Sequence, residues 1–238
     1  MKLDSFHFDT IGSTNTWAKE NYSKFDRHRI TLITADQQTA GRGRHKRTWM
    51  SPEKQNIYAT FTFFMDPSRL DICNVPQILA LSVQETLIDK GFDSQIKWPN
   101  DILLKKKKLG GILCETIADP LTVVVVLGLG LNINMPMDLL ETIDQPATSL
   151  LAEVGWTYNL QSILKPLVGN FSKNLEQFLK EGFSSFVDRF RQMIIHQEND
   201  LLKIGNQTGR FMGIADDGAL IIKMDNGENQ KIYSGEIL

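Results

Sequence analysis

The sequence predicts an α+β fold with a small all-β unit at its C-terminal end. Strand-like and helix-like stretches follow one another through residues 1–193, and one apolar run there is uniform enough for a central strand. Residues 194–238 instead hold short strand-like runs separated by Asp- and Gly-rich turns. A chain of 238 residues is long enough for one large and one small domain. We therefore expect a first domain over 1–193 and a small β-barrel over 194–238.

The composition is that of a folded globular protein, and it argues against several classes of function. With 26 Lys and Arg against 28 Asp and Glu the net charge is −2, so overall charge does not attract nucleic acid or an anionic membrane. The two cysteines are too few for a disulfide framework, and the four histidines form no zinc-binding cluster. The longest apolar run, eleven residues over 121–131, is shorter than the roughly 20 that a bilayer span needs. We expect a cytoplasmic protein without a membrane segment.

The first elements follow from local patterns in order along the chain. Alternating apolar and polar residues over 5–9 predict a strand, and a turn with a helix cap over 12–15 predicts a helix over 15–22. Residues 29–36 alternate and are rich in β-branched side chains, as in a strand. Residues 39–53 have two glycines, a proline and four cations without an apolar period, which predicts a long, mobile and functional loop.

The middle of the chain predicts further strands around one helix. Residues 56–65 read as a strand, and the apolar face over 76–90 predicts a helix that ends before a glycine. Two short strands on either side of a proline are followed by a strand over 109–117, which pairs with the second of them across four lysines. The uniformly apolar residues 122–127 predict a central strand buried on both faces and ending at the next glycines. The two short strands are expected over 94–98 and 101–104.

The last third of the chain predicts two helices and then short strands. Apolar residues spaced three and four apart over 160–179 predict a long amphipathic helix, with Asn159 as its cap and a kink at Pro166. A second helix is expected over 185–196. Three short strands separated by Asp-Gly and Asn-Gly turns then predict the β-barrel. These strands are expected over 207–212, 219–224 and 230–233.

A glycine–arginine loop is the first candidate for a binding site. Residues 41–44 read Gly-Arg-Gly-Arg, and Arg47 and Trp49 follow. Glycines let successive backbone N–H groups converge on an anion, and guanidinium groups bind phosphate or carboxylate through two hydrogen bonds. An aromatic ring such as Trp49 can stack on a nucleobase. A solvated basic loop and a core tryptophan would have the same sequence, so both interpretations remain open at this point.

Other segments carry polar groups at predicted strand ends. Residues 97–101 (KWPND) place a cation, an amide and a carboxylate together on backbone that the proline holds extended. The lysines of 105–108 are typical of a solvated turn. Glycines at 110–111 and 128–130 indicate a close approach to the backbone or strand bulges. An amide such as that of Asn132 can bind both the N6 donor and a ring-nitrogen acceptor of an adenine, or can simply belong to a turn.

In order and spacing these segments resemble the biotin protein ligase family, and the resemblance covers nearly the whole chain. The glycine–arginine loop combined with KWPND is specific to that family. The resemblance implies a catalytic domain with the mixed sheet of class II aminoacyl-tRNA synthetases, followed by an SH3-like β-barrel. The matching segments are Ser13-Thr14-Asn15, Gln38, residues 41–44 with Arg47, WMSP over 49–52, KWPND over 97–101, KLGGIL over 108–113, GLGLN over 128–132 and SGEI over 234–237.

The resemblance implies a two-step ligase reaction. Family members join the biotin carboxylate to the α-phosphate of MgATP, which gives biotinyl-5′-AMP and pyrophosphate. They then transfer biotin to one lysine of a biotin carboxyl carrier protein or carrier domain. ATP, Mg²⁺ and biotin are thus the expected ligands, and a homodimer is compatible with the sequence. Because the matching segments begin at residue 13, we expect no N-terminal DNA-binding domain and a monofunctional ligase that does not bind DNA.

The resemblance also implies roles for individual residues. Cations are needed because a carboxylate and a triphosphate repel each other. Among the four turn lysines we favour Lys108, whereas Asp101 could face metal, phosphate or the acceptor amine, so that no metal ligand is assigned. The expected catalytic residues are Arg42, Arg44, Lys97, Asp101 and Lys108. The expected biotin-binding residues are Ser13, Thr14, Asn15, Gln38, Gly41, Arg42, Lys108, Gly111 and Gly128. The expected ATP-binding residues are Gly43, Arg44, Arg47, Trp49, Lys97, Asn100, Leu131 and Asn132.

Two departures from the family pattern and three alternative functions remain. The loop has His45 and Lys46 where relatives often have a further glycine, and the sequence ends at Leu238 where relatives often continue with an arginine. A lipoate or octanoate ligase shares the fold but has a glycine-rich motif that is absent here. A nucleic-acid-binding protein would use the two basic loops and the barrel. A regulatory homologue would bind biotin without transferring it.

Overall fold

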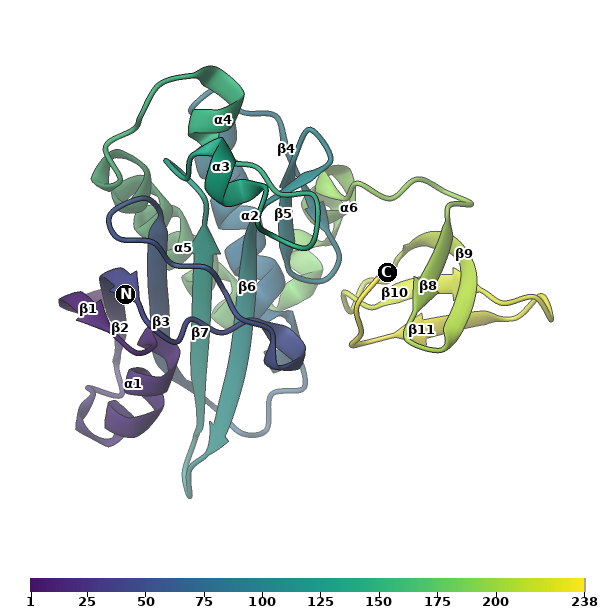
Figure 1. The fold of residues 1–238 in the computed structure, drawn as a ribbon. Coiled ribbons are helices and arrows are strands. Elements are labelled where there is room, and N and C mark those ends of the chain that lie inside the picture. Colours follow the sequence, from purple (N-terminus) through teal and green to yellow (C-terminus); the bar gives the residue numbers. More distant parts are fainter. Residues whose placement is uncertain (238) are drawn as a thin grey trace.

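The computed structural model describes residues 1–237 and contains a seven-stranded mixed sheet and a four-stranded antiparallel sheet (Figure 1). The expected α+β fold is therefore confirmed. The elements of the first part are β1 (Lys2–Ile11), α1 (Thr14–Asn21), β2 (Arg29–Gln38), β3 (Ile57–Met65), α2 (Val75–Ile88), β4 (Ser94–Lys97), β5 (Asp101–Leu104), β6 (Lys107–Ala118), β7 (Val123–Leu131), α3 (Met137–Leu140), α4 (Leu150–Val154), α5 (Gln161–Glu181) and α6 (Val187–Met193).

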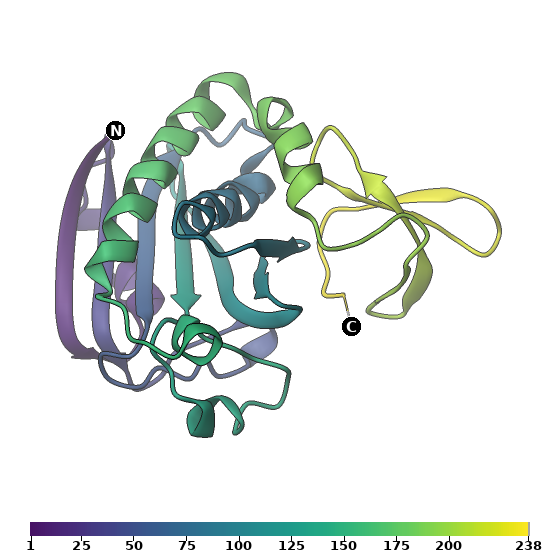
Figure 2. The same cartoon turned by 90° about the horizontal axis from the view of Figure 1, so that it is seen from above.

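The larger sheet has the strand order β1-β2-β3-β7-β6-β5-β4. Strands β1 and β2 pair in parallel, and the other neighbours are antiparallel. Helices α2 and α5 lie over one face, where the rings of Phe61 on β3 and Phe171 on α5 pack 4.7 Å apart (Figure 2). Helix α1 packs against β3 and β7 on the opposite face. The main core thus lies between the sheet and the helix pair.

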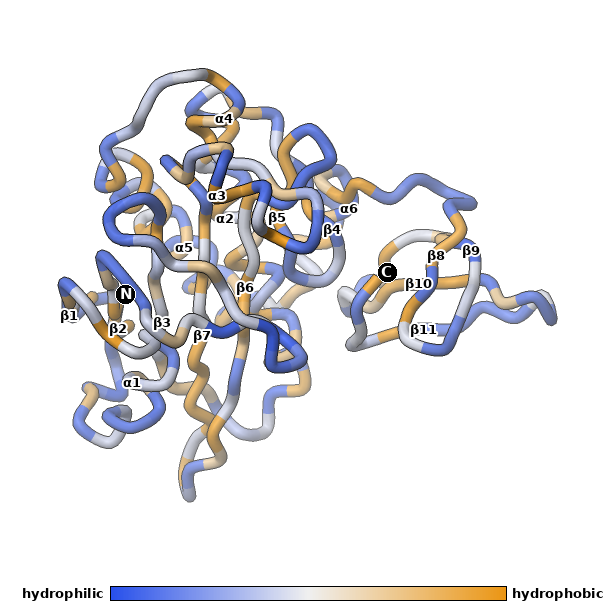
Figure 3. Tube along the Cα trace, in the orientation of Figure 1, coloured by the Kyte–Doolittle hydropathy of each residue, from blue (hydrophilic) through white to orange (hydrophobic). Residues whose placement is uncertain are grey.

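Strand β7 lies in the middle of the sheet, as its apolar sequence predicts, and most of its trace has the orange of hydrophobic residues in Figure 3. Leu127 and Leu129 point into the main core, whereas Val124 and Val126 point into the smaller core beneath α1. The strand does not end at its glycines, which corrects the sequence-based boundary. Pairing with β3 and β6 continues on both sides up to Leu131, because glycine leaves the ladder of backbone hydrogen bonds intact. The glycines therefore remove side chains from one face of a continuing strand.

Several other boundaries differ from the predicted ones. The last helix of the first part ends at Met193 rather than residue 196, because Ile194 is extended and pairs with Ile96 on β4. Helix α5 continues through Pro166, and the side chain of Asn159 accepts a hydrogen bond from the N–H of Gln161 (2.9 Å), as expected for a cap. The short helices α3 and α4 were not predicted, because each spans no more than five residues and shows no periodicity.

The C-terminal part is a small antiparallel sheet of the SH3-like type, set to one side of the larger part (Figure 1). A bridge between Ile204 and Ile237 brings the end of the chain back to the first strand of this C-terminal sheet. The boundary at 193/194 remains a prediction, although no named element crosses it. The strands are β8 (Leu201–Ile204), which was not predicted, β9 (Gln207–Ile214), β10 (Leu220–Lys223) and β11 (Asn229–Ile232), in the order β11-β10-β9-β8.

The two parts dock through the turn between β9 and β10. The carbonyl of Gly218 accepts hydrogen bonds from the Trp98 indole (3.2 Å) and the Gln77 amide (2.9 Å). Asn74 donates to the carbonyl of Asp217 (3.0 Å). Gly218 has a φ of +80°, and a Cβ there would lie 2.1 Å from Asn74 Nδ2, so that only glycine fits. The turn is therefore held in a fitted recess of the larger part.

The packing of α5 gives a direct test of the core. We expect Phe171→Ala to lower the free energy of unfolding by about 3–5 kcal/mol, because Phe171 is fully buried between α5 and the sheet. Chemical denaturation monitored by circular dichroism measures the change. Leu70→Ala is the control: Leu70 is 97% exposed, and its truncation should alter stability by no more than about 0.5 kcal/mol. Equal effects of the two changes would contradict this arrangement.

Candidate functional site

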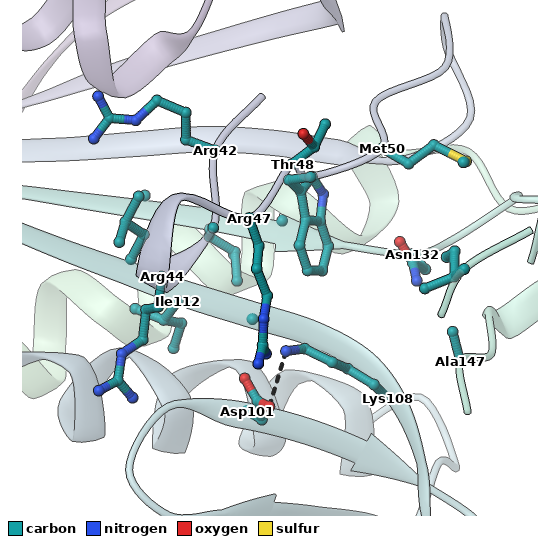
Figure 4. A pocket seen from close by; sticks show the side chains of 18 of the residues that line it. Arg42, Arg44, Arg47, Thr48, Met50, Asp101, Lys108, Ile112, Asn132 and Ala147 are labelled. Atoms are coloured by element: carbon teal, nitrogen blue, oxygen red, sulfur yellow. Dashed lines mark ion pairs between the residues drawn. The ribbon is translucent and has the colours of Figure 1, made fainter. Parts of the chain in front are cut away.

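A cavity of about 530 Å³ opens above the glycine-bearing halves of β6 and β7 (Figure 4). Its size is in the range of small-molecule and cofactor sites. Most of the site residues expected from the sequence line it, although they come from segments far apart in the chain. Those residues are Ser13, Thr14, Asn15, Gln38, Arg42, Gly43, Arg44, Arg47, Trp49, Asn100, Asp101, Lys108, Gly111, Gly128 and Asn132.

The floor of the cavity is a patch of strand backbone. Because side chains alternate between the faces of a strand, Gly128 and Gly130 lie on the same face as Val126, beyond the part that α1 covers. On β6, Gly111 pairs with Gly130, and Leu113 pairs with Gly128. These glycines therefore mark a close approach rather than bulges.

The indole of Trp49 lies directly on this floor. A Cβ at Gly130 would be 2.2 Å from the indole, and one at Gly111 would be 3.3 Å from it. The indole Nε1 is buried and has no hydrogen-bond partner among the described residues. The Lys108 ammonium lies 5.9 Å from the ring centroid. The ring thus lines the cavity instead of the main core, with its N–H unused.

The glycine–arginine loop folds back on itself as a short hairpin. The N–H of Gly43 donates to the carbonyl of Arg47 (2.8 Å), and the N–H of Trp49 donates to the carbonyl of Gly41 (2.9 Å). His45 and Lys46 form its tip with φ values of +53° and +61°. Whether the loop is mobile before a ligand binds remains a prediction. Its fold presents the arginine side chains in different directions.

Each arginine of the hairpin is held by a different part of the protein. Arg44 donates to Oδ1 of Asn100 (3.0 Å), the residue directly before β5. Arg47 forms an ion pair with Glu236 of the C-terminal part, beyond β11. Arg42 forms an ion pair with Glu115 on β6, with 2.6 Å between Nη2 and Oε1. The loop therefore bridges β6, the KWPND segment and the C-terminal part.

Lys108 and Asp101 form an ion pair in the cavity, with 2.9 Å between Nζ and Oδ2 (Figure 4). They lie on adjacent strands, β6 and β5, where the register shifts after Ile102. Lys105, at the turn between these strands, pairs with Glu153 instead. The preference for Lys108 over the other turn lysines thus agrees with its place in the cavity.

The opposite end of the cavity is a network of neutral polar groups. Gln38 Oε1 accepts hydrogen bonds from the N–H (2.9 Å) and the hydroxyl (3.0 Å) of Thr14. Asn15 donates to the carbonyl of Leu113 (3.3 Å) and accepts from Thr60 (2.6 Å). A Cβ at Gly128 would lie 2.3 Å from Asn15 Oδ1. The Asn15 amide is thus engaged within the protein, and Ser13 and Gln38 lie beside it.

Three expected site residues do not line this cavity. Leu131 is fully buried in the core, and Gly41 is buried beneath the Trp49 carbonyl, which a Cβ would approach to 2.4 Å. Lys97 lines a second cavity of about 560 Å³ near β4 and the C-terminal part. Asp101 and Lys108 line both cavities, so Lys97 lies next to the same ion pair.

Sequence reasoning also missed several residues that line the first cavity. Glu236 lies within the recognised SGEI segment, but nothing in that segment indicates contact with the loop. Residues 142–147 belong to irregular structure after α3 and carry no pattern that predicts a site. The lining residues not expected from sequence include Thr48, Met50, Ile112, Leu113, Leu129, Gly130, Met135, Thr142, Ile143, Asp144, Gln145, Ala147 and Glu236.

Comparisons with known proteins agree with this site. The Biotin/lipoate A/B protein ligase family matches residues 7–132, and the Biotin protein ligase C terminal domain matches residues 202–238. The chain belongs to the biotin/lipoate A/B protein ligase family, and the resemblance to biotin protein ligases is confirmed.

Individual relatives match over most of their length. The Bifunctional ligase/repressor BirA of Bacillus subtilis is 30% identical over 97% of this chain and 72% of the relative. The Biotin–[acetyl-CoA-carboxylase] ligase of Paracoccus denitrificans is 28% identical over 86% of this chain and 88% of the relative. A solved biotin protein ligase from Aquifex aeolicus, in complex with biotin and ATP, is 28% identical with a TM-score of 0.81, covering 99% of this chain and 97% of that one.

A histidine in the second cavity gives a pH-dependent test. Burial lowers the pKa of His196 from 6.5 to about 4, and the charge of Lys97 adds to the effect. Between these pH values the unfolded chain binds a proton that the folded state does not, so stability should fall as the pH drops from 6.5 towards 4. Denaturation at several pH values should show a smaller fall for His196→Leu than for the wild type. His28→Leu, at an exposed histidine, is the control and should retain the wild-type dependence.

Proposed function

We propose that this chain adenylates biotin with MgATP and transfers the biotinyl group to a lysine of a carrier protein of a biotin-dependent enzyme. The observation that carries the proposal is the single cavity that joins the glycine–arginine loop, KWPND and Lys108. The matches to the family and to the biotin protein ligase C-terminal domain support biotin as the acid.

The cavity has the charge that the first step requires. An oxygen of the biotin carboxylate attacks the α-phosphorus and forms a new P–O bond, while the bond between the α-phosphorus and the α,β-bridging oxygen breaks and pyrophosphate leaves with that oxygen and the bond electrons. Both reactants are anions, so their approach is opposed unless cations lie between them. Arg42, Arg44, Arg47 and Lys108 line the cavity and supply this charge. Fixed positive groups of this kind stabilise the transition state of phosphoryl and nucleotidyl transfer.

The two ends of the cavity suit the two substrates. Donors and acceptors of Ser13, Thr14 and Gln38 at one end match the ureido ring of biotin, and the cavity above the glycine-bearing strands has room for its chain. Near the hairpin, Trp49 offers a flat ring and an unused N–H, and Asn132 lies in the wall. We assign this end to the adenosine of ATP. The hairpin above it excludes water from the reactive anhydride.

The donor set also fits magnesium. Mg²⁺ prefers carboxylate, phosphate and water oxygens, and Asp101 and Asp144 are carboxylates that line the cavity. These residues would hold the ion together with the phosphates of ATP. When bound, it would neutralise negative charge on the phosphates.

The second step transfers biotin to an amine. The lysine nitrogen of the carrier protein attacks the carbonyl carbon of biotinyl-5′-AMP, an amide bond forms and AMP leaves with the C–O bond electrons. The amine must lose a proton in this step. Asp101 faces both cavities through its position at the start of β5, so it can meet a group that enters from either side.

The setting of the reaction is part of the same proposal. We place the enzyme in the cytoplasm, which the free Cys73 and Cys114 support. We also propose that it has no DNA partner, which the net charge of −2 supports. No helix among the described residues combines the length and the apolar character needed to cross a membrane. A homodimer remains a prediction, for which the open edge of β1 offers a surface.

The decisive experiment is ATP–pyrophosphate exchange with biotin, lipoate, octanoate or no acid. We expect exchange that depends on biotin and on Mg²⁺, and that stops when a chelator removes the metal. Incubation with a biotin carboxyl carrier domain should then give a mass increase on one lysine. Exchange with lipoate or octanoate alone would place the protein with the sister ligases, and a folded protein without exchange would contradict adenylation.

Single truncations of the cavity cations should slow the first step. We expect Lys108→Ala and Arg44→Ala each to reduce the exchange rate by about 10²–10³-fold, as for the loss of one group that stabilises a developing charge. Lys107→Ala is the matched control, because Lys107 is the exposed neighbour of Lys108 at the start of β6 and lines neither cavity. A loss below about threefold in Lys108→Ala or Arg44→Ala would contradict the assigned role.

A further inference from the structure

Glu115 on β6 is the meeting point of three polar groups from different segments. Its Oε1 accepts from Lys19 Nζ on α1 (2.7 Å) and from Arg42 Nη2 in the hairpin (2.6 Å). Its Oε2 accepts from Asn15 Nδ2 (3.1 Å). The carboxylate is 21% exposed, whereas the Arg42 side chain is 44% exposed. One half-buried carboxylate therefore carries two cations on the same oxygen.

This carboxylate stays ionised at neutral pH. Burial alone would raise the pKa of Glu115, but hydrogen bonds from Lys19 and Asn15 and the charges of Arg42 and Lys19 outweigh it and lower the pKa below its usual value. A charged Glu115 attracts Arg42, and because both side chains are partly exposed the attraction is weak enough for an entering anion to compete with it.

The ion pair with Glu115 directs the Arg42 side chain away from the centre of the cavity (Figure 4). In Figure 4 the Arg42 side chain points away from the Lys108–Asp101 pair, whereas Arg47 points towards that pair. The backbone at Arg42 is fixed by its bridge to Thr48, so the direction of the guanidinium depends on the side chain and its partner. Glu115 is that partner.

We propose that Glu115 is a positioning residue that holds Arg42 outside the reaction centre and releases it to the carboxylate of biotin, and that Lys19 makes the release easy. This inference rests on the proposed function. An entering carboxylate competes with Glu115 for the same guanidinium. When Arg42 leaves, Lys19 remains on Glu115, so no unpaired carboxylate is left in a half-buried position, which would be costly.

Substitutions of Glu115 and of Lys19 should therefore have opposite effects on biotin binding. Glu115→Gln weakens the hold on Arg42 yet keeps an oxygen that can accept from Asn15 and Lys19. Lys19→Gln leaves Glu115 with Arg42 as its one cation among the contacts described above. By calorimetric titration with biotin, we expect about threefold tighter binding for Glu115→Gln and about threefold weaker binding for Lys19→Gln, in the range of partly exposed ion pairs.

A double-mutant cycle separates this mechanism from a general effect of charge. If Glu115 acts through Arg42, then Glu115→Gln should not change biotin affinity in an Arg42→Ala background. A general electric field would persist there. Trypsin supplies a readout that needs no biotin: cleavage after Arg42, located by mass spectrometry, should be faster in Glu115→Gln than in the wild type and slower in Lys19→Gln.

The outcomes distinguish the two proposals. A folded wild-type protein that binds no biotin overturns the proposed function, while the trypsin comparison still tests the hold on Arg42. If the wild type binds biotin, then a shift of both variants in the same direction overturns the inference. So does weaker binding by Glu115→Gln, or an effect of that change that persists without Arg42. If Glu115→Gln does not fold, Lys19→Gln carries the test through both readouts.

Discussion

The functional site depends on the way one central strand serves two purposes. The first half of β7 carries valines that α1 covers, and the second half carries glycines on the same face. Because β3 and β6 pair with it along its whole length, the glycine half is held as rigidly as the core. A patch of strand backbone without side chains of its own therefore forms the floor of the cavity, and the Trp49 indole and the Asn15 amide pack directly against it. A single residue of slippage would place Leu127 and Leu129 there and close the cavity.

The loop above this floor is tied down from several directions. Its backbone closes on itself, and its side chains reach β6, the segment after β4 and the C-terminal part. These ties are ion pairs and hydrogen bonds at partly exposed positions, so each is weak, and a charged ligand can exchange one partner for another. Such an arrangement favours a loop that has a defined resting fold and still responds to an anion.

The sequence predicts the regular elements well and their ends poorly. The uniform apolar character of residues 122–127 places the central strand, but nothing local shows that its glycines continue to pair. The site residues emerge from the spacing of motifs, and the cavity gathers most of them. Sequence patterns could not indicate that Leu131 points into the core, that Lys97 faces a second cavity, or that Glu115 and Glu236 hold the arginines. Those facts depend on which side chains from distant segments meet in three dimensions.

Trp98 shows that a segment recognised for its polar side chains also has a structural role. Its neighbours in the KWPND segment reach the cavities, but Trp98 is buried and donates to the carbonyl of Gly218 in the C-terminal part. The backbone that carries Asn100 and Asp101 is therefore clamped on its other side by a turn more than a hundred residues away. The hydrogen bond from Trp98 joins the two parts of the chain at this point. A displacement of the C-terminal part would therefore pull on the segment that carries two cavity-lining residues, in addition to moving Glu236, which lines the same cavity.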